Sequence, residues 1–236
     1  MTGRPFGDVT SVLFDLDGTL VDTTELIISS HEHTLRQHLR SGWQPTRRDI
    51  LRNVGRSLFE TLHDYAVADK AADVAEASEQ MLRTYRDYQR ANHDDMIRPF
   101  EGMSETLGIL RERGYTLGVV TSKLEENARL ALDMYDLGGY FPLGVFHDDT
   151  ERHKPDPAPL LLAVRKGGLD APRTVYVGDS IHDMAAGRAA GMRTVAALWG
   201  PFPREDLELE HPEAFAKSPP ALLELLPGVR KSGGAS

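Results

Sequence analysis

Two carboxylates that are two residues apart follow a short apolar run near the beginning of the chain. The run covers 12–14, and it leads directly into Asp15-Leu16-Asp17-Gly18-Thr19. Alternate residues of a strand point to the same side, so Asp15 and Asp17 would lie roughly 6 to 7 Å apart. One of them could attack an electrophile such as phosphorus while the other exchanges a proton with the leaving group. The simpler interpretation is a turn, in which an Asp before a Gly is common.

Apolar runs that are typical of buried strands recur along the chain. They lie at 12–14, 115–120, 143–146, 174–177 and 193–198. Between them are helical patterns at 101–113, 123–135, 157–166 and 182–190. Strands that alternate with helices predict an α/β fold built on a Rossmann-like parallel sheet.

Polar groups that could act together with the two aspartates follow the other predicted strands. They are Thr121 and Ser122, then Lys154 before a Pro-Asp-Pro sequence, and finally Asp179 and Asp183 in Gly178-Asp179-x-x-x-Asp183. The carboxyl ends of parallel strands form one edge of an open sheet, which is where ligands bind. We therefore expect these groups to face one site at that edge.

The region 22–95 interrupts the alternation, because it has helical patterns and no convincing strand. Helices are predicted over 26–39, 49–63 and 69–90. Asp22 and Glu25 have the spacing of a capping box at the first of these helices. We interpret the region 22–95 as an all-helical cap, inserted into a discontinuous core that consists of 1–21 and 96–236.

Gly55 and Arg56 are the candidates for substrate contact within the helical region. A glycine lets the backbone approach a ligand, and an arginine can bind a carboxylate or a second phosphate. The alternative is an exposed turn between two helices. His31 and His33 face different sides of their helix, so we expect them to be solvated or partly packed and not to chelate a metal together.

Composition places the chain among globular proteins and limits its partners. Of 236 residues, 40% are hydrophobic and 27% charged, and there is no cysteine for disulfides or thiolate chemistry. We expect a cytoplasmic protein, because no apolar run suits a membrane helix or a signal peptide. The expected oligomeric state is a monomer or a homodimer. The net charge of −9 disfavours nucleic acid as a partner. A phosphate site in such a chain needs its own local positive charge.

The ordered set of motifs resembles the haloacid dehalogenase superfamily of phosphatases over nearly the whole chain. Asp15-x-Asp17-Gly18-Thr19, then Thr121, then Lys154, then Gly178-Asp179-x-x-x-Asp183 match its four motifs. The stretch from Asp17 to Thr23, the helical insertion and the stretch from Val177 to Asp183 are most similar to the phosphoglycolate phosphatase branch. Asp148-Asp149 before Lys154 and Leu198-Trp-Gly-Pro201 also resemble the pyrophosphatase of that branch.

The resemblance implies a role for each matching residue. Asp15 would be the nucleophile and Asp17 the general acid and later the general base. Mg²⁺ would be held by Asp15, Asp179 and the backbone carbonyl of Asp17, with Asp183 as a further candidate metal ligand. Asp183 has an alternative role as a helix cap, because Ser180-x-x-Asp183 has the spacing of a capping box.

Electrostatics independently favours a cation at this site. Like charges about 4 Å apart repel by about 4 kcal/mol at an effective dielectric constant of 20, so clustered carboxylates and a phosphate need cations. Lys154 would supply one positive charge. Substrate-binding candidates at the core are Gly18, Thr19, Thr121, Ser122 and Lys154. Ser122 and Glu125 predict a helix that begins directly after Thr121 and offers free N–H groups to phosphate.

The predicted function is Mg²⁺-dependent hydrolysis of a small phosphorylated metabolite, such as 2-phosphoglycolate, through an aspartyl-phosphate. The alternatives are an inorganic pyrophosphatase and a phosphomutase of the β-phosphoglucomutase type. A non-enzymatic phosphate-binding regulator is the least favoured, because every position of the catalytic motifs is filled.

Overall fold

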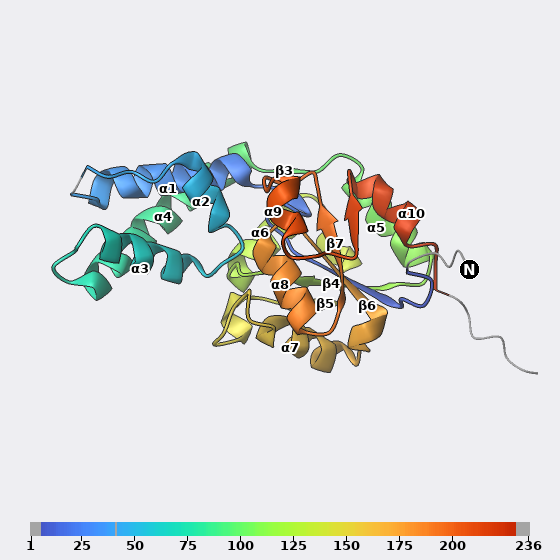
Figure 1. Ribbon diagram of the computed structural model, residues 1–236. Helices are drawn as coiled ribbons and strands as arrows, with labels where there is room; N and C mark the ends of the chain where they lie inside the picture. Colours follow the sequence, from blue (N-terminus) through green and yellow to red (C-terminus); the bar gives the residue numbers. More distant parts are fainter. Residues whose placement is uncertain (1–5, 41, 230–236) are drawn as a thin grey trace, which may run out of the picture.

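A computed structural model describes residues 6–40 and 42–229, and a six-stranded parallel sheet forms its centre (Figure 1). The strand order is β5-β4-β1-β6-β7-β8. The strands are β1 Ser11–Phe14, β4 Thr116–Val120, β5 Leu143–Val145, β6 Thr174–Gly178, β7 Arg193–Ala197 and β8 Ala214–Ala216. Every neighbouring pair is parallel. The predicted α/β architecture is confirmed, and β8 is a strand that the sequence patterns did not indicate.

Helices cover both faces of the sheet because each strand buries side chains in both directions. The helices are α5 Met103–Glu112, α6 Glu125–Met134, α7 Ala158–Gly167, α8 Ile181–Ala189, α9 Arg204–Glu208 and α10 Leu222–Leu225. Val12 and Phe14 pack with residues of α5, α6 and α10. Leu13 points the other way and packs with residues of α7 and α8. The period-two alternation of β1 thus assigns helices to the two faces.

The second part of the structure is a group of four helices that lies at the end of the core away from α5 and α10 (Figure 1). They are α1 Thr24–His38, α2 Arg47–Arg52, α3 Leu58–Ala68 and α4 Val74–Met96. The chain passes between the core and the four helices twice. The two connecting segments pair with each other, since β2 Val21–Asp22 runs antiparallel to β3 Arg98–Pro99. A separate apolar cluster, with Leu35, Leu62 and Met81 at its centre, holds the four helices together.

Two local predictions in this region are wrong. The helix predicted over 49–63 is two helices, because Gly55 has a φ of +92° and interrupts it. The capping box of Asp22 and Glu25 does not form. Asp22 accepts a hydrogen bond from the backbone of Thr24, and Glu25 pairs instead with Arg47 of α2.

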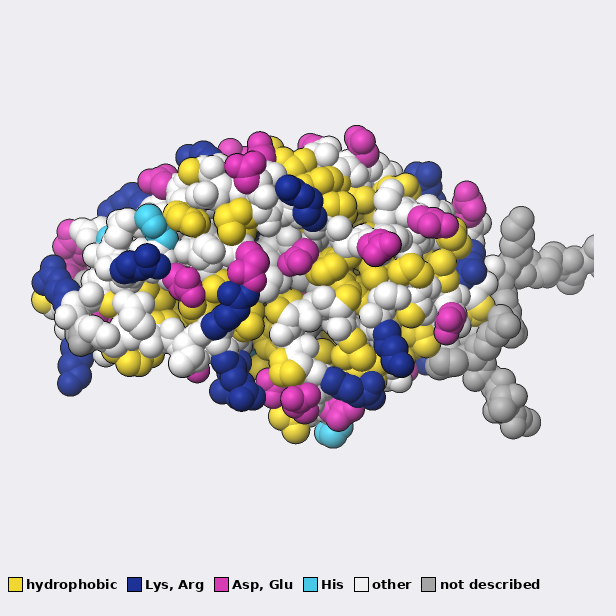
Figure 2. Space-filling view, turned by 90° about the horizontal axis from the view of Figure 1, so that it is seen from above, with side chains coloured by type: hydrophobic (Ala, Val, Ile, Leu, Met, Phe, Trp, Pro, Cys, Tyr) yellow, Lys and Arg dark blue, Asp and Glu magenta, His cyan; other side chains and the backbone are white. Residues whose placement is uncertain are grey.

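None of the helices in the described residues is both long and apolar enough to cross a membrane. Seen from above, acidic and basic side chains are interspersed over the surface of both parts (Figure 2).

Candidate active site

The first aspartate lies at the carboxyl end of the central strand and is almost fully buried. Its backbone N–H still belongs to the sheet and donates to the carbonyl of Val177 over 2.9 Å. Its Oδ1 accepts a hydrogen bond of 2.8 Å from Lys154 Nζ. Burial raises the pKa of Asp15 to about 7, with Asp183 and Asp17 adding to the effect and Lys154 opposing it. A charged carboxylate at this position therefore depends on nearby cations.

Lys154 is 1% exposed and is the cation at the centre of the cluster. Its Nζ donates to Asp15 Oδ1 at 2.8 Å, Asp183 Oδ1 at 2.7 Å and the Tyr176 hydroxyl at 3.0 Å. Three acceptors satisfy all three protons of an ammonium group. Burial opposes its charge, but the two carboxylates outweigh burial and raise the pKa of Lys154 well above its ordinary value. Lys154 is a permanent positive charge at the sheet edge.

Asp183 is both a helix cap and a partner of Lys154. Its Oδ2 accepts from the Ser180 backbone and hydroxyl at 3.0 and 2.6 Å, and Ser180 in return accepts from the Asp183 N–H. Its Oδ1 accepts from Lys154. Although burial opposes ionisation, Lys154 and Ser180 lower the pKa of this carboxyl. The helix-cap interpretation of Asp183 is therefore confirmed, and the cap together with Lys154 leaves this carboxylate little acceptor capacity for a metal.

Asp179 has an oxygen with no partner among the described residues. Its Oδ1 accepts from the Thr19 hydroxyl at 2.9 Å, whereas Oδ2 is buried without a hydrogen bond. Burial, together with Asp183 and Asp15, raises the pKa of Asp179 well above its ordinary value. Gly18 and Gly200 enclose this side chain, since a Cβ on either would lie within 2.5 Å of an Asp179 atom. The packing therefore holds an uncompensated carboxylate in place.

The three buried aspartates fit a divalent metal ion. Asp15, Asp179 and Asp183 each offer an oxygen, and these atoms lie within 4.8 Å of one another. Three carboxylates and the single Lys154 charge leave two negative charges uncompensated when all are ionised. A hard dication with oxygen ligands would neutralise them and would give Asp179 Oδ2 its partner. The free oxygens make Asp15 and Asp179 better ligands than Asp183.

Asp17 projects beyond the buried cluster and forms an ion pair that the sequence motifs did not indicate. Lys123 Nζ lies 2.7 Å from Asp17 Oδ1, and both side chains are mostly buried. Lys123 directly follows Thr121 and Ser122, so its position in the chain was the only available signal. Tyr176 was also missed, because a tyrosine in a buried strand is usually a packing residue.

Thr121 and Ser122 lie at the site, but the predicted helix start is wrong. α6 begins at Glu125, with Leu124 at its N-cap, and no capping box forms with Ser122. Thr121 Oγ1 accepts instead from the Lys123 N–H at 3.2 Å. The Ser122 hydroxyl donates to the carbonyl of Gly55 at 2.8 Å and so joins the core to the helical segment.

Gly55 and Arg56 both border the site but differ in their availability. A Cβ on Gly55 would lie 2.7 Å from Ser180 Oγ, so the glycine allows the loop to approach α8. The Arg56 guanidinium is engaged within the helical segment, where it contacts Asn53 at 2.9 Å and Asp64 at 3.2 Å. The loop meets the core at Ser122 and Ser180, and Arg56 already has protein partners. Contact of Gly55 or Arg56 with substrate stays a prediction.

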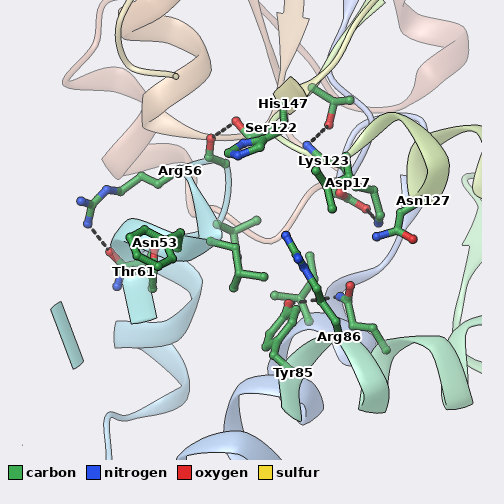
Figure 3. Close-up of a pocket in the computed structure, with 18 of the residues that line it drawn as sticks. Asp17, Asn53, Arg56, Thr61, Tyr85, Arg86, Ser122, Lys123, Asn127 and His147 are labelled. Atoms are coloured by element: carbon green, nitrogen blue, oxygen red, sulfur yellow. Dashed lines mark hydrogen bonds and ion pairs between the residues drawn. The ribbon is translucent and has the colours of Figure 1, made fainter. Parts of the chain in front are cut away.

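A cavity of about 120 Å³ separates the sheet edge from the helical segment. Its core wall includes Asp15, Asp17, Thr121, Ser122, Lys123 and Asn127, and its helical wall includes His31, Gly55, Arg56, Tyr85 and Arg86. Figure 3 shows side chains from the two walls pointing towards each other across the cavity. Gly18, Thr19, Lys154, Asp179 and Asp183 lie behind the core wall.

His31 is buried in the helical wall of this cavity, and His33 is not part of it. Its Nδ1 bonds the Ile27 carbonyl at 2.9 Å, and its ring meets Tyr85 edge-on at 4.8 Å between centroids. Burial lowers the pKa of His31 to about 4, so the ring is neutral at neutral pH.

Comparisons with known proteins show the family of the chain. The model of the haloacid dehalogenase-like hydrolase family matches residues 12–197. Pyrophosphatase PpaX of Bacillus velezensis is 40% identical over 191 residues, which cover 81% of this chain and 84% of that protein. Pyrophosphatase PpaX of Bacillus pumilus is 36% identical over 218 residues, which cover 92% of this chain and 96% of that protein.

Solved structures with the same fold cover nearly the whole chain. A hydrolase from Pseudomonas syringae aligns with a TM-score of 0.80 at 26% identity, over 91% of this chain and 96% of that one. A predicted phosphoglycolate phosphatase from Haemophilus somnus also has a TM-score of 0.80, over 92% of this chain and 98% of that one. At 23% identity the second likeness supports the fold alone.

Proposed function

Because the chain belongs to the haloacid dehalogenase-like hydrolase family and is a phosphatase, we propose that its substrate is inorganic pyrophosphate, whose phosphoanhydride bond is cleaved at Asp15. Two observations support this choice over 2-phosphoglycolate, which the sequence motifs alone put first. The names of the relatives at 36–40% identity favour pyrophosphate. The cavity beside Asp15 is small and is lined by several cationic side chains, which suits a compact polyanion.

The observation that carries the proposal is the unpartnered buried oxygen of Asp179 beside Asp15 and Lys154. A purely structural cluster would have no reason to leave a buried carboxylate oxygen unsatisfied, since this costs stability. We propose that Mg²⁺ is held there by Asp15, Asp179 and the backbone carbonyl of Asp17. When bound, it would supply positive charge for the carboxylates and the phosphate oxygens.

The chain's own residues then perform two displacements at one phosphorus atom. An oxygen of Asp15 attacks phosphorus, the bond from phosphorus to the leaving oxygen breaks, and an aspartyl-phosphate forms. Asp17 gives a proton to the leaving group and takes one from the water that hydrolyses the aspartyl-phosphate. Lys154 favours the ionised form of Asp15 and holds its carboxylate in place.

Lys123 has a part in this scheme that follows from its ion pair with Asp17. An arriving phosphate offers Lys123 a second anionic partner, which frees Asp17 Oδ1 for proton transfer. Thr121 and Ser122 would hold the phosphate oxygens. The helical segment acts as a cap that limits access of water and selects the leaving group.

Location, oligomeric state and partners stay predictions: a cytoplasmic monomer or homodimer that acts on a small phosphorylated metabolite and not on nucleic acid.

Release of inorganic phosphate from a substrate panel tests the proposal. The panel contains pyrophosphate, 2-phosphoglycolate, a sugar phosphate, a nucleotide and an aryl phosphate, each with Mg²⁺ and with EDTA. We expect Mg²⁺-dependent release that is fastest from pyrophosphate and absent in Asp15→Asn. A faster reaction with 2-phosphoglycolate would replace the proposed substrate. No release from any compound by folded, Mg²⁺-loaded protein would refute the hydrolase mechanism at Asp15.

A further inference from the structure

Arg86 is a half-buried cation in the wall of the cavity. It lies on α4, and among the described residues no hydrogen-bond acceptor or carboxylate is paired with it. Figure 3 shows its guanidinium extending from α4 into the cavity, towards the core wall that carries Ser122 and His147. Its charge also acts on that wall, since the pKa of His147 is lowered by burial, by His153 and by Arg86.

The other cations around the cavity already have protein partners. Lys154 is bound to Asp15 and Asp183, and Lys123 is bound to Asp17. Arg56 is bound to Asp64, and so its charge is neutralised within the helical segment. Arg86 has no such carboxylate partner among the described residues, although the chain has 36 acidic and only 27 basic residues. A guanidinium that points into a cavity without a counter-ion suits an anion that comes from outside.

The position of Arg86 opposite the nucleophile indicates which part of a substrate it would meet. In a phosphoryl transfer the attacking and leaving oxygens lie roughly in line with phosphorus. Asp15 attacks from the sheet edge, so the leaving group points away from the core and towards the helical wall. Arg86 is on that wall, whereas Lys154 and Lys123 are on the core side.

We propose that Arg86 binds the anionic part of the leaving group and thereby determines substrate specificity. The ligand chemistry is an oxyanion, either the second phosphoryl group of pyrophosphate or the carboxylate of a phosphorylated acid. This inference rests on the proposed function, because it presumes phosphoryl transfer to Asp15. It replaces Arg56, the arginine favoured from the sequence, by a residue thirty positions later in the same helical segment.

The test compares substrates whose leaving groups differ in charge. Wild type and Arg86→Gln are assayed with pyrophosphate, 2-phosphoglycolate and an uncharged aryl phosphate. We expect kcat/KM to fall about 10- to 100-fold for an anionic leaving group, the usual effect of losing a hydrogen bond to a charged group. The aryl phosphate should react at an unchanged rate. A selective loss with pyrophosphate or with 2-phosphoglycolate identifies the oxyanion.

Two further variants separate charge from folding. Arg86→Lys keeps the charge but not the planar two-pronged donor, so it should recover part of the lost activity. Arg83→Gln is the matched control on the same helix, since Arg83 is exposed and pairs with Glu79 outside the cavity. It should leave all three rates and their ratios unchanged. Equal losses on all three substrates in Arg86→Gln, or no loss on any, would overturn the inference.

A binding measurement keeps the inference testable if the proposed function fails. The probe is imidodiphosphate, an unreactive analogue of pyrophosphate, titrated calorimetrically into Mg²⁺-loaded wild type and Arg86→Gln. Affinity should fall about tenfold or more in the variant. Equal affinities would refute the role of Arg86, even in an active enzyme. If the protein hydrolyses no compound of the panel but Arg86→Gln still binds imidodiphosphate more weakly than wild type, only the proposed function is refuted.

Discussion

Among the single residues of the site, Lys154 compensates only part of the negative charge of the three buried aspartates. One ammonium group neutralises one of three buried carboxylates, and its hydrogen bonds go to Asp15 and Asp183. Asp179 receives a hydroxyl group from Thr19 and no cation. The result is a raised pKa at Asp15 and Asp179 and a lowered one at Asp183. Residues of one type, a few ångströms apart, thus differ in acidity because their partners differ.

Protonation of Asp15 predicts that stabilisation by Mg²⁺ depends on pH. The pKa of Asp15 rises from 3.8 to about 7 on folding. Asp15 therefore stabilises the folded, metal-free protein at low pH, and this stabilisation is lost as the pH rises from 3.8 to about 7. Mg²⁺ must displace the proton, so it should raise Tm more at about pH 8 than at about pH 5.5. Thermal unfolding with MgCl₂ and with EDTA at both pH values measures this.

Asp15→Asn is the control for the pH effect, since its amide does not titrate. The difference between the two pH values should shrink in this variant, although Asp179 still titrates there. An Mg²⁺ effect in wild type that is equal at both pH values would contradict the assignment of a metal to Asp15.

At the scale of elements, the site depends on how the loop between α2 and α3 docks onto the core. The Gly55 carbonyl accepts from Ser122, which follows β4. The His182 side chain on α8 donates to the Arg52 carbonyl at 3.0 Å. Ser180, the N-cap of α8, is the residue that a side chain at Gly55 would strike. One loop of the helical segment therefore contacts Ser180, the N-cap residue of α8 that also holds the Asp183 carboxylate.

This arrangement predicts different effects for two glycine substitutions. Gly55 and Gly42 both have positive φ, +92° and +71°, so Ala at either should cost about 1 to 2 kcal/mol of stability. Only at Gly55 does the added Cβ meet another residue, because nothing lies within 4 Å of Gly42. Gly55→Ala should therefore also displace Ser180 and lower kcat/KM about tenfold or more.

Parallel measurements of urea unfolding and phosphate release on both variants check the glycine prediction. Gly42→Ala is the matched control, since it should lose stability and keep wild-type activity. Equal activity in the two variants would show that contact between the loop and α8 does not position the site.

Across the whole molecule, each part has its own main apolar cluster, and the parts share the cavity and a small cluster in which Leu26 of α1 packs with Ala131 of α6. Leu62 belongs to the cluster of the helical segment, while Val175 belongs to the core beneath the sheet. Two antiparallel chain crossings at β2 and β3 connect the parts. Proteins open locally in such cooperative units, so the helical segment is expected to open at lower free energy than the sheet.

Leu62→Ala is predicted to destabilise the helical segment without unfolding the core. A buried Leu→Ala change costs about 2 to 5 kcal/mol, and here the loss is confined to the contacts of α1, α3 and α4. Amide hydrogen exchange should accelerate in these helices and stay slow in β1, β4 and β6. Val175→Ala is the control, because it should accelerate exchange throughout the core. Uniform acceleration by Leu62→Ala would mean that the two parts unfold as one unit.

The order of elements and the identity of the groups at the sheet edge could be predicted from local sequence patterns. Apolar runs and glycine or capping signals are local, and they were enough to place β1, β4, β5, β6 and β7 and the helices between them. Strand ends in a parallel sheet share one edge, so Asp15, Lys154 and Asp179 could be predicted to lie together. The capping box of Ser180 and Asp183 is equally local and forms as its spacing indicates.

The partners of these groups could not be predicted from local patterns, because they depend on how the elements pack. The spacing of Ser122 and Glu125 is also that of a capping box, yet Ser122 bonds the distant Gly55 carbonyl and the helix begins later. Lys123 pairs with Asp17 across more than a hundred residues, and Arg56 is neutralised while Arg86 is not. Such choices depend on distances between elements that are remote in sequence, because a charged side chain bonds to the partner that packing brings within reach.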